Sequence, residues 1–166
     1  MMLDIPSSAA TWFLPFALPI GFWVGWNDMA RMKIPNKAVM ALFFVYLVIG
    51  PLALPLETYA WQWLHLVVVL LAGFILNMIG LMGAGDAKFA AVMAPFVALG
   101  DAATFCYIYV ACSLAALVVH RTMRAIPAIR RAAPHWESWE RKDFPMGLAL
   151  GWMLILYLAL GVVYGR

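Results

Sequence analysis

Six long apolar runs, separated by short polar segments, organise the chain. The runs cover roughly residues 10–30, 38–56, 61–82, 87–99, 102–119 and 144–164. A helix needs about 20 mostly apolar residues to cross a bilayer, and all but the short fourth run approach that length. The pattern predicts an all-α integral membrane protein with six transmembrane helices in a single domain, residues 1–166. Pro15 and Pro19 lie inside the first run, where membrane helices tolerate proline.

The composition excludes a soluble protein. Apolar residues make up 66% of the chain and charged residues 11%, against about 45–50% and about 25% in a soluble domain. We therefore expect membrane lipid around the chain and no nucleic-acid partner. Cys106 and Cys112 share one apolar run that has no CxxC motif, so we interpret them as small apolar residues. No cluster has the spacing of metal ligands, and we expect no metal.

The distribution of basic residues predicts the orientation, because cytoplasmic loops carry an excess of Lys and Arg. With the N-terminus outside, segments 31–37, 83–88 and 120–143 face the cytoplasm and hold ten of the eleven basic residues. These are Arg31, Lys33, Lys37, Lys88, Arg121, Arg124, Arg130, Arg131, Arg141 and Lys142. Asp4, and no basic residue, precedes the first run, which is the reverse of a secretory signal. We predict that both termini lie outside the cytoplasm.

Two aspartates lie at the predicted cytoplasmic face, where apolar runs end. Asp28 closes the first run, and Asp86 stands in the turn Gly83-Ala84-Gly85-Asp86-Ala87-Lys88 after the third. Ionisable residues in a membrane are costly and mark functional sites. Two carboxylates close together do not both ionise easily, so one can activate water while the other, protonated, polarises a peptide carbonyl. This predicts aspartyl proteolysis by Asp28 and Asp86, without a metal.

Each aspartate also has a structural interpretation. Asp86 suits a helix N-cap, and Asp28 suits an ion pair with Arg31 three residues on. Gly83 and Gly85 permit a tight turn and leave free space beside the Asp86 carboxylate, which a peptide needs in order to approach it. Only the two aspartates together favour the catalytic interpretation.

The other polar residues give weaker signals. Pro35 and Asn36 suit a helix stop and an N-cap, and Lys88 suits an interfacial lysine. Gly100-Asp101 is expected to form a tight connection at the opposite face, without a part in the site. Segment 120–143 suits an interfacial loop attracted to anionic lipid or, alternatively, a surface that holds substrate or a partner. Three histidines are expected to be interfacial residues with satisfied hydrogen bonds: His65, His120 and His135.

A family resemblance rests on three motifs. Asp28-x-x-Arg31-x-Lys33-Ile34-Pro35-Asn36, followed by Gly83-x-Gly85-Asp86-x-Lys88, resembles the type IV prepilin peptidases, which are GxGD-type intramembrane aspartyl proteases. Phe144-Pro145-Met146-Gly147, with Ala149 and Gly151, resembles the Pro-x-Gly opening of the family's last helix. The resemblance implies that Asp28 and Asp86 are the catalytic pair. The residues expected to support them are Gly83, Gly85, Lys88, Pro35 and Asn36.

The resemblance also implies a substrate and a location. Family members cut the leader peptides of prepilins and pseudopilins at the cytoplasmic face, usually after a glycine just before the pilin's hydrophobic helix. Larger members carry a domain with paired CxxC motifs and methylate the new N-terminus. This chain has neither the CxxC motifs nor such a domain, so we expect no cofactor and no methyltransferase activity. It is most like the short form that serves tight-adherence (Flp) pili in the bacterial inner (cytoplasmic) membrane; archaeal preflagellin peptidases are also short.

Three lysines near the motifs are candidates for substrate binding. Flp-type pilins are expected, by the same resemblance, to carry a glutamate shortly after the cut. Lys33, Lys37 or Lys88 is expected to pair with it; contact with lipid phosphates is the alternative.

Two other classes of function are compatible with the sequence. In an ion-coupled carrier, Asp28 and Asp86 would bind the coupling ion, but carrier sites typically lie near the membrane midplane. A non-catalytic scaffold of a pilus or secretion apparatus would not need the intact pair. A mobility shift of a co-expressed pilin separates a peptidase from both.

Overall fold

The computed structural model describes residues 2–141 and 143–166, and the chain is helical. The elements are α1 (Ser7–Arg31), α2 (Asn36–Ala53), α3 (Leu56–Met78), α4 (Ala84–Met93), η1 (Ala94–Phe96), η2 (Leu99–Asp101), α5 (Ala102–Ala125), α6 (Pro127–Ala132), η3 (Glu137–Trp139) and α7 (Met146–Tyr164). Within the described residues, β pairing is limited to one isolated bridge between Leu3 and Gly165. The predicted all-α fold is confirmed.

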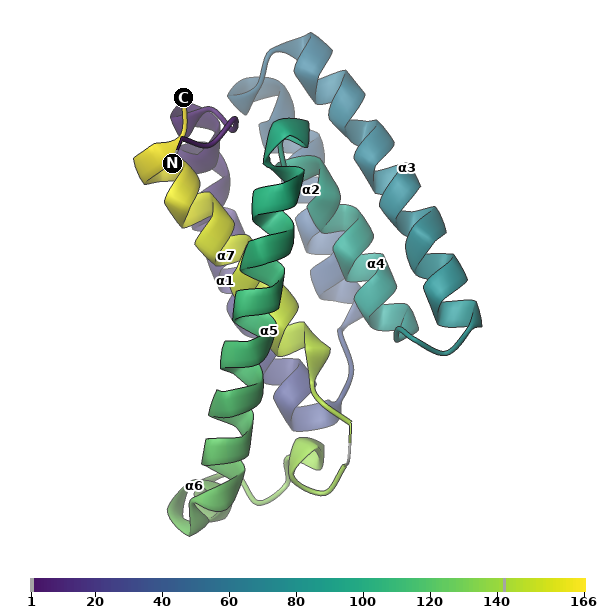
Figure 1. The fold of residues 1–166 in the computed structure, drawn as a ribbon, viewed down its shortest axis with the longest axis vertical. Helices are drawn as coiled ribbons and strands as arrows, with labels where there is room; N and C mark the ends of the chain where they lie inside the picture. Colours follow the sequence, from purple (N-terminus) through teal and green to yellow (C-terminus); the bar gives the residue numbers. More distant parts are fainter. Residues whose placement is uncertain (1, 142) are drawn as a thin grey trace.

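Five stretches are long and apolar enough to cross a membrane. They are Ser7–Arg31, Asn36–Ala53, Leu56–Met78, Leu99–Ala125 and Met146–Tyr164. The fourth predicted run is not among them, because α4 has only ten residues and spans about 15 Å of the roughly 30 Å of hydrocarbon. The α-helix stops before Pro95, since proline disfavours helix at the residue that precedes it. The 3-10 turns η1 and η2 continue the path between α3 and α5 (Figure 1).

Both termini lie at one end of the molecule (Figure 1). The Leu3 amide donates to the Tyr164 carbonyl, the Ser7 amide donates to the Arg166 carbonyl, and Asp4 pairs with Arg166 at 2.9 Å. The α1–α2, α3–α4 and α5–α7 connections lie toward the other end. The three basic segments therefore gather at one end, although Lys142 itself lies outside the described residues.

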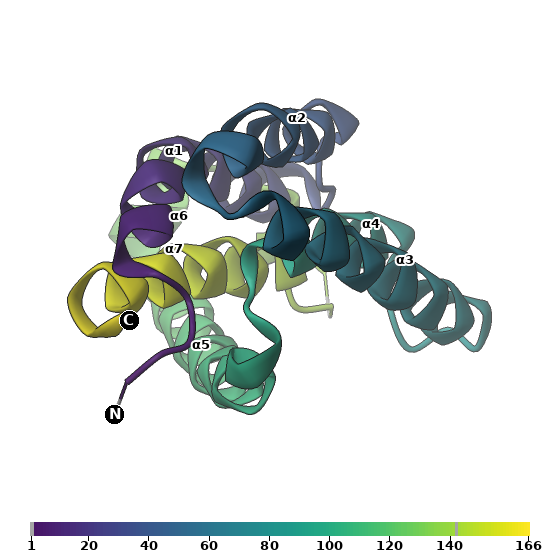
Figure 2. The same ribbon diagram turned by 90° about the horizontal axis from the view of Figure 1, so that it is seen from above.

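Close packing of α1 on α7 fixes the end of α1 that carries Asp28 (Figure 2). A Cβ added at Gly21 would come within 2.8 Å of the Gly151 carbonyl oxygen, and one added at Gly151 would collide with the Gly21 carbonyl. Small residues let membrane helices approach in this way. The contact brings the last turn of α1 beside the first turn of α7.

An aromatic cluster fills the core between α1, α2 and the α4–α5 connection. Phe13 meets Phe96 with ring centroids 4.8 Å apart, and Tyr46 meets Phe96 at 5.2 Å. The Tyr46 hydroxyl donates to Gln62 on α3 at 3.0 Å. In contrast, the outer faces of α3 and α5 expose rows of Leu and Val side chains. Such faces suit contact with lipid and agree with a multi-pass membrane protein.

Asp101 differs from the expectation of a passive turn residue. It is 3% exposed, and its carboxylate accepts hydrogen bonds from the Asp4 amide, the Ile5 amide and the Tyr157 hydroxyl. It thereby joins the N-terminal segment, η2 and α7 at the end of the molecule where the termini lie. Its three partners are separated from it in the sequence, which gives no sign of these contacts.

We expect Asp101→Asn to lower the stability of the protein. An amide nitrogen in place of one carboxylate oxygen would face a donor, and a buried donor left unpaired costs about 1–3 kcal/mol. Thermal unfolding in detergent should show a lower midpoint, with the exposed Asp143→Asn as the matched control. Equal midpoints for the two variants would show that the Asp101 contacts contribute nothing.

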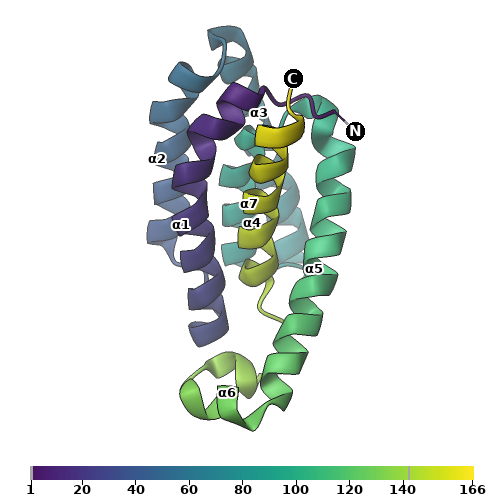
Figure 3. The same ribbon diagram turned by 90° about the vertical axis from the view of Figure 1, so that its left-hand side faces the viewer.

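His120 also departs from its expected environment. It lies inside α5 rather than in the polar loop, is 1% exposed, and stacks on Trp139 with ring centroids 5.7 Å apart. Among the described residues, neither ring nitrogen has a hydrogen-bond partner. His120 is buried because α5 continues into the basic segment and the chain then folds back through η3, which brings Trp139 onto the His120 ring. Beside η3, Trp136 meets Trp26 of α1 (Figure 3). Binding of lipid or substrate by this segment stays a prediction.

Candidate active site

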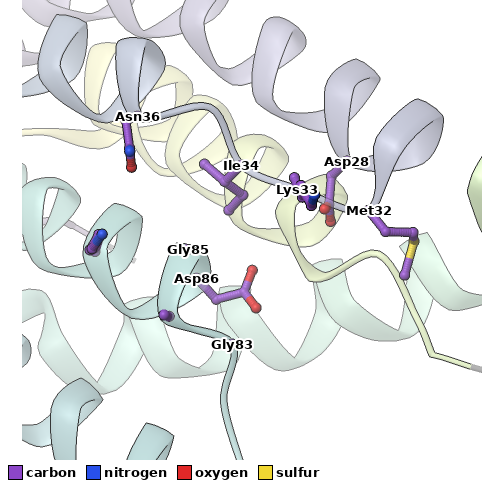
Figure 4. A pocket seen from close by; sticks show the side chains of 10 residues that line it. Asp28, Met32, Lys33, Ile34, Asn36, Gly83, Gly85 and Asp86 are labelled. Atoms are coloured by element: carbon purple, nitrogen blue, oxygen red, sulfur yellow. The ribbon is translucent and has the colours of Figure 1, made fainter.

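A cavity of about 340 Å³ lies where the ends of α1 and α4 meet the α1–α2 connection (Figure 4). The elements that form it meet toward the end of the molecule that carries the basic segments (Figure 1). Its walls are formed by Asp28, Met32, Lys33, Ile34, Asn36, Gly83, Ala84, Gly85, Asp86 and Lys88. The structure thus brings the two aspartates, far apart in the sequence, into one cavity.

Asp28 is held by the start of α7. It lies in the last turn of α1, 5% exposed, and its Oδ2 accepts a hydrogen bond of 2.7 Å from the Gly147 amide. Gly147 is in the first turn of α7, where free amides and the helix dipole favour a negative charge. Among the described residues Asp28 forms no ion pair with Arg31, so that structural interpretation is wrong.

Gly147 is a site residue that the sequence reasoning treated only as part of a motif. A Cβ added there would lie 2.9 Å from Asp28 Cβ and 3.0 Å from Asp28 Oδ2. Any side chain would therefore compete with Asp28 for space. The signal was the Pro145-x-Gly147 pattern, since proline opens a helix and a glycine beside it permits close approach.

Asp86 lies in the first turn of α4 and is half-buried. The helix begins at Ala84 and Gly83 occupies the N-cap position, so the interpretation of Asp86 as the N-cap is wrong. A Cβ added at Gly83 would lie 2.6 Å from Asp86 Oδ2. The Asp86 carboxylate can therefore occupy its observed position only because Gly83 has no side chain. At Gly85 an added Cβ would meet Ile34 at an ordinary 3.5 Å.

At the start of α2, Pro35 takes the N-cap position that was expected for Asn36. Pro35 occupies the N-cap position with extended φ and ψ, and Asn36 is the first helical residue. Asn36 therefore does not cap the helix; its exposed side chain lines the cavity. Pro35 does not line the cavity and fixes the turn before α2.

The three candidate lysines separate into two groups. Lys33 and Lys88 line the cavity, whereas Lys37 does not. Lys88 shares the cavity with Asp86 although the two lie on different faces of α4. Because Lys88 lines the cavity, it is better placed than Lys37 to contact a substrate there.

The first turn of α4 is positioned by two neighbours. A Cβ added at Gly73 of α3 would come within 2.9 Å of the Ala87 Cβ, so α3 and α4 touch at this point. On the other side, Gly85 faces Ile34 of the α1–α2 connection. These contacts hold Asp86 opposite the segment that follows Asp28.

The site therefore offers two carboxylates in one open cavity whose lining also includes Lys33 and Lys88. Within the described residues, no group of three or more His, Cys, Asp or Glu side chains comes together as a set of metal ligands. Such a site can carry out acid–base chemistry with two carboxyl groups.

Comparison with known families identifies the class. Residues 15–120, well over half of the chain, match the profile of the type IV leader peptidase family, whose members are peptidases of the aspartic type. The chain belongs to this family. The matched range includes Asp28 and Asp86 and ends before Gly147. No curated protein and no solved structure matches the chain.

Proposed function

We propose that the protein is a membrane-embedded aspartyl endopeptidase that removes the leader peptide of type IV prepilins at the cytoplasmic face, with Asp28 and Asp86 as the catalytic pair. The observation that supports this most directly is the shared cavity of the two aspartates in a member of the leader peptidase family. Both carboxyl groups are within reach of a peptide that enters the cavity from its open side.

In the proposed mechanism the two carboxyl groups have different roles. The Gly147 amide stabilises negative charge on Asp28, so Asp28 takes a proton from the attacking water. Asp86, protonated, donates to the carbonyl oxygen of the scissile peptide. Asp28 then returns its proton to the leaving amine when the carbon–nitrogen bond breaks. As the carbonyl group re-forms, a hydroxyl of the tetrahedral intermediate returns a proton to Asp86, so both carboxyl groups end in the protonation states in which they began.

The finer features of the function follow from the resemblance. We propose that the substrates are Flp-type prepilins or pseudopilins in the bacterial inner membrane, and that the new N-terminus is left as a free amine. A carrier is less compatible with the site, because the cavity lies at one end of the helices and not midway along them.

The test of the function is co-expression with a candidate Flp-type prepilin. The account expects a shift of the pilin to the mobility of the mature form, which disappears when Asp28 and Asp86 are both changed to Asn. An unchanged prepilin in the presence of well-expressed wild-type protein would favour a carrier or a scaffold.

We expect six membrane passes with both termini outside the cytoplasm, the fourth made by α4 with η1. Reporter fusions after Lys37 and within 121–141 should then give a cytoplasmic signal, and a fusion after Glu57 an external one. The physical reason is the concentration of basic residues in the first two regions. A cytoplasmic signal at Glu57 would overturn this orientation.

We expect Lys88 to contribute to substrate binding through a glutamate that follows the cut. Lys88→Glu should raise KM several-fold, and a pilin with the reverse Glu→Lys change should restore it, because opposite charges across the cavity edge attract. Lys37→Glu, outside the cavity, is the matched control. If Lys88→Glu and Lys37→Glu behave alike with both pilins, the pairing is absent.

A further inference from the structure

A second, larger cavity of about 950 Å³ lies beside α4, toward the end of the molecule that carries the termini. We call it the α4 groove. Its lining is mostly apolar and comes from α3, from the path of α4 through η2, from α5 and from Met153 of α7. Ala90, Met93, Ala94, Val97, Val68 and Cys106 are among the less polar residues of the lining.

Along α4, the lining of the groove begins about one turn after Asp86 of the catalytic cavity. Asp86 lines the catalytic cavity, and Ala90, Met93, Ala94 and Val97 line the groove. Ala90 and Met93 follow Asp86 by four and seven residues within α4, which places these three residues on one side of the helix. A segment that lies in the groove is therefore in line with Asp86.

The groove is bordered by helices whose outer surfaces suit contact with lipid. α4 runs between α3 and α5 in Figure 1. Val68 on α3 is 55% exposed, and Cys106 on α5 is exposed. Both line the groove, so an occupant can enter sideways from the membrane.

We propose that the α4 groove holds the hydrophobic helix that follows the cleaved bond in the substrate, with its N-terminal end at Asp86 and its axis along α4. The proposal rests on the proposed function, because the substrate must be a polypeptide that is cut at the two aspartates. It adds a membrane-level docking site to the cavity where the bond is broken.

The charges around the groove favour a polypeptide helix over a phospholipid. The polar residues of the lining gather toward its outer end and include the acids Asp4 and Glu57. Among the residues that the structure describes, no Lys or Arg lines the groove, so a lipid phosphate would meet two carboxylates there and no cation from this part of the chain. The lining at this end also includes Thr58, Gln62 and His65, whose side chains can donate hydrogen bonds to the free backbone carbonyls at the C-terminal end of a substrate helix.

The first experiment fills the groove from its exposed edge. Val68→Trp places a large side chain in the groove, and Val67→Trp, one residue away on the same helix, is the matched control. Val67 is 49% exposed and does not line the groove. Prepilin cleavage by the purified variants in proteoliposomes should show kcat/KM at least about tenfold lower for Val68→Trp and near wild type for Val67→Trp.

Two results would overturn the proposal: near-normal cleavage by Val68→Trp, or equal losses in both variants with equal thermal unfolding midpoints. Wild-type cleavage of the same prepilin is measured alongside. If the wild-type protein fails to cleave, the proposed function fails; if it cleaves and Val68→Trp does so equally well, only the groove proposal fails.

The second experiment uses the two native cysteines. Single cysteines are placed along the hydrophobic segment of the prepilin, and disulfide formation with the wild-type protein is induced by a mild oxidant in proteoliposomes. Crosslinks should recur about every three to four pilin residues, disappear in Cys106→Ser, and persist in Cys112→Ser, because Cys112 does not line the groove. Crosslinks that survive Cys106→Ser, or none at any pilin position, would contradict the proposed docking.

Discussion

Asparagine in place of either Asp28 or Asp86 is expected to reduce leader cleavage by about 10²–10⁴-fold, the usual contribution of general acid–base catalysis. Asparagine keeps the size and polarity of aspartate but cannot exchange a proton. In Asp28→Asn the amide side chain would still present an oxygen to the Gly147 amide, which now donates to Asp28 at 2.7 Å. Both variants should therefore insert and fold normally. Leader cleavage in membranes with matched expression is the measurement.

The two losses should not add, because each carboxyl group works only with the other. The double variant should be about as inactive as either single variant. Glu140→Gln is the control, since Glu140 is exposed in the basic segment and does not line the cavity. Asp101, at the end of the molecule that carries the termini, is unsuitable for this purpose because its own contacts hold the N-terminal segment and α7 together. Near-normal cleavage by either single variant would remove that aspartate from the mechanism.

Gly147→Ala is expected to cause the second largest loss, about 10²-fold in kcat. The added methyl would lie 2.9–3.1 Å from three atoms of the Asp28 side chain, so the carboxylate must move. A displacement of about 1 Å in a catalytic group can cost that much. KM should change little, because Gly147 does not line the cavity. Steady-state kinetics in proteoliposomes separates the two constants.

The control for this variant is Gly25→Ala, at the same α1–α7 interface. There the new methyl meets the flexible end of the Leu148 side chain at 3.3 Å and does not touch Asp28. It should keep most of the activity and a similar thermal midpoint. If Gly147→Ala is as active as Gly25→Ala, the contact between Gly147 and Asp28 has no part in catalysis.

The aspartate pair could be predicted because each aspartate is recognised from its immediate neighbours in the sequence. A carboxylate at the end of an apolar run is costly, and the basic residues that follow Asp28 and Asp86 assign both to one face. The helices follow from the apolar runs for the same reason. The short α4 was harder to predict, because a single proline, Pro95, decides where the helix stops.

Other features arise from contacts between residues far apart in the sequence, and no local pattern carries them. The Gly147 amide reaches Asp28 only because Gly21 and Gly151 let α1 and α7 approach. The burial of His120 depends on the fold of a loop beneath it. The prediction that Asn36 caps α2 is wrong because Pro35 takes the N-cap position, and the Asn36 side chain lines the cavity instead.

The central claim is that Asp28 and Asp86 cleave a prepilin leader in this protein without a further component. The most direct measurement is mass spectrometry of a prepilin incubated in proteoliposomes with the purified chain as the only added protein, in the presence of a metal chelator. The account predicts one cut, after the glycine that precedes the hydrophobic segment, a free amine on the mature pilin, and no product with the Asp28→Asn/Asp86→Asn variant. The same product from that double variant would contradict the account.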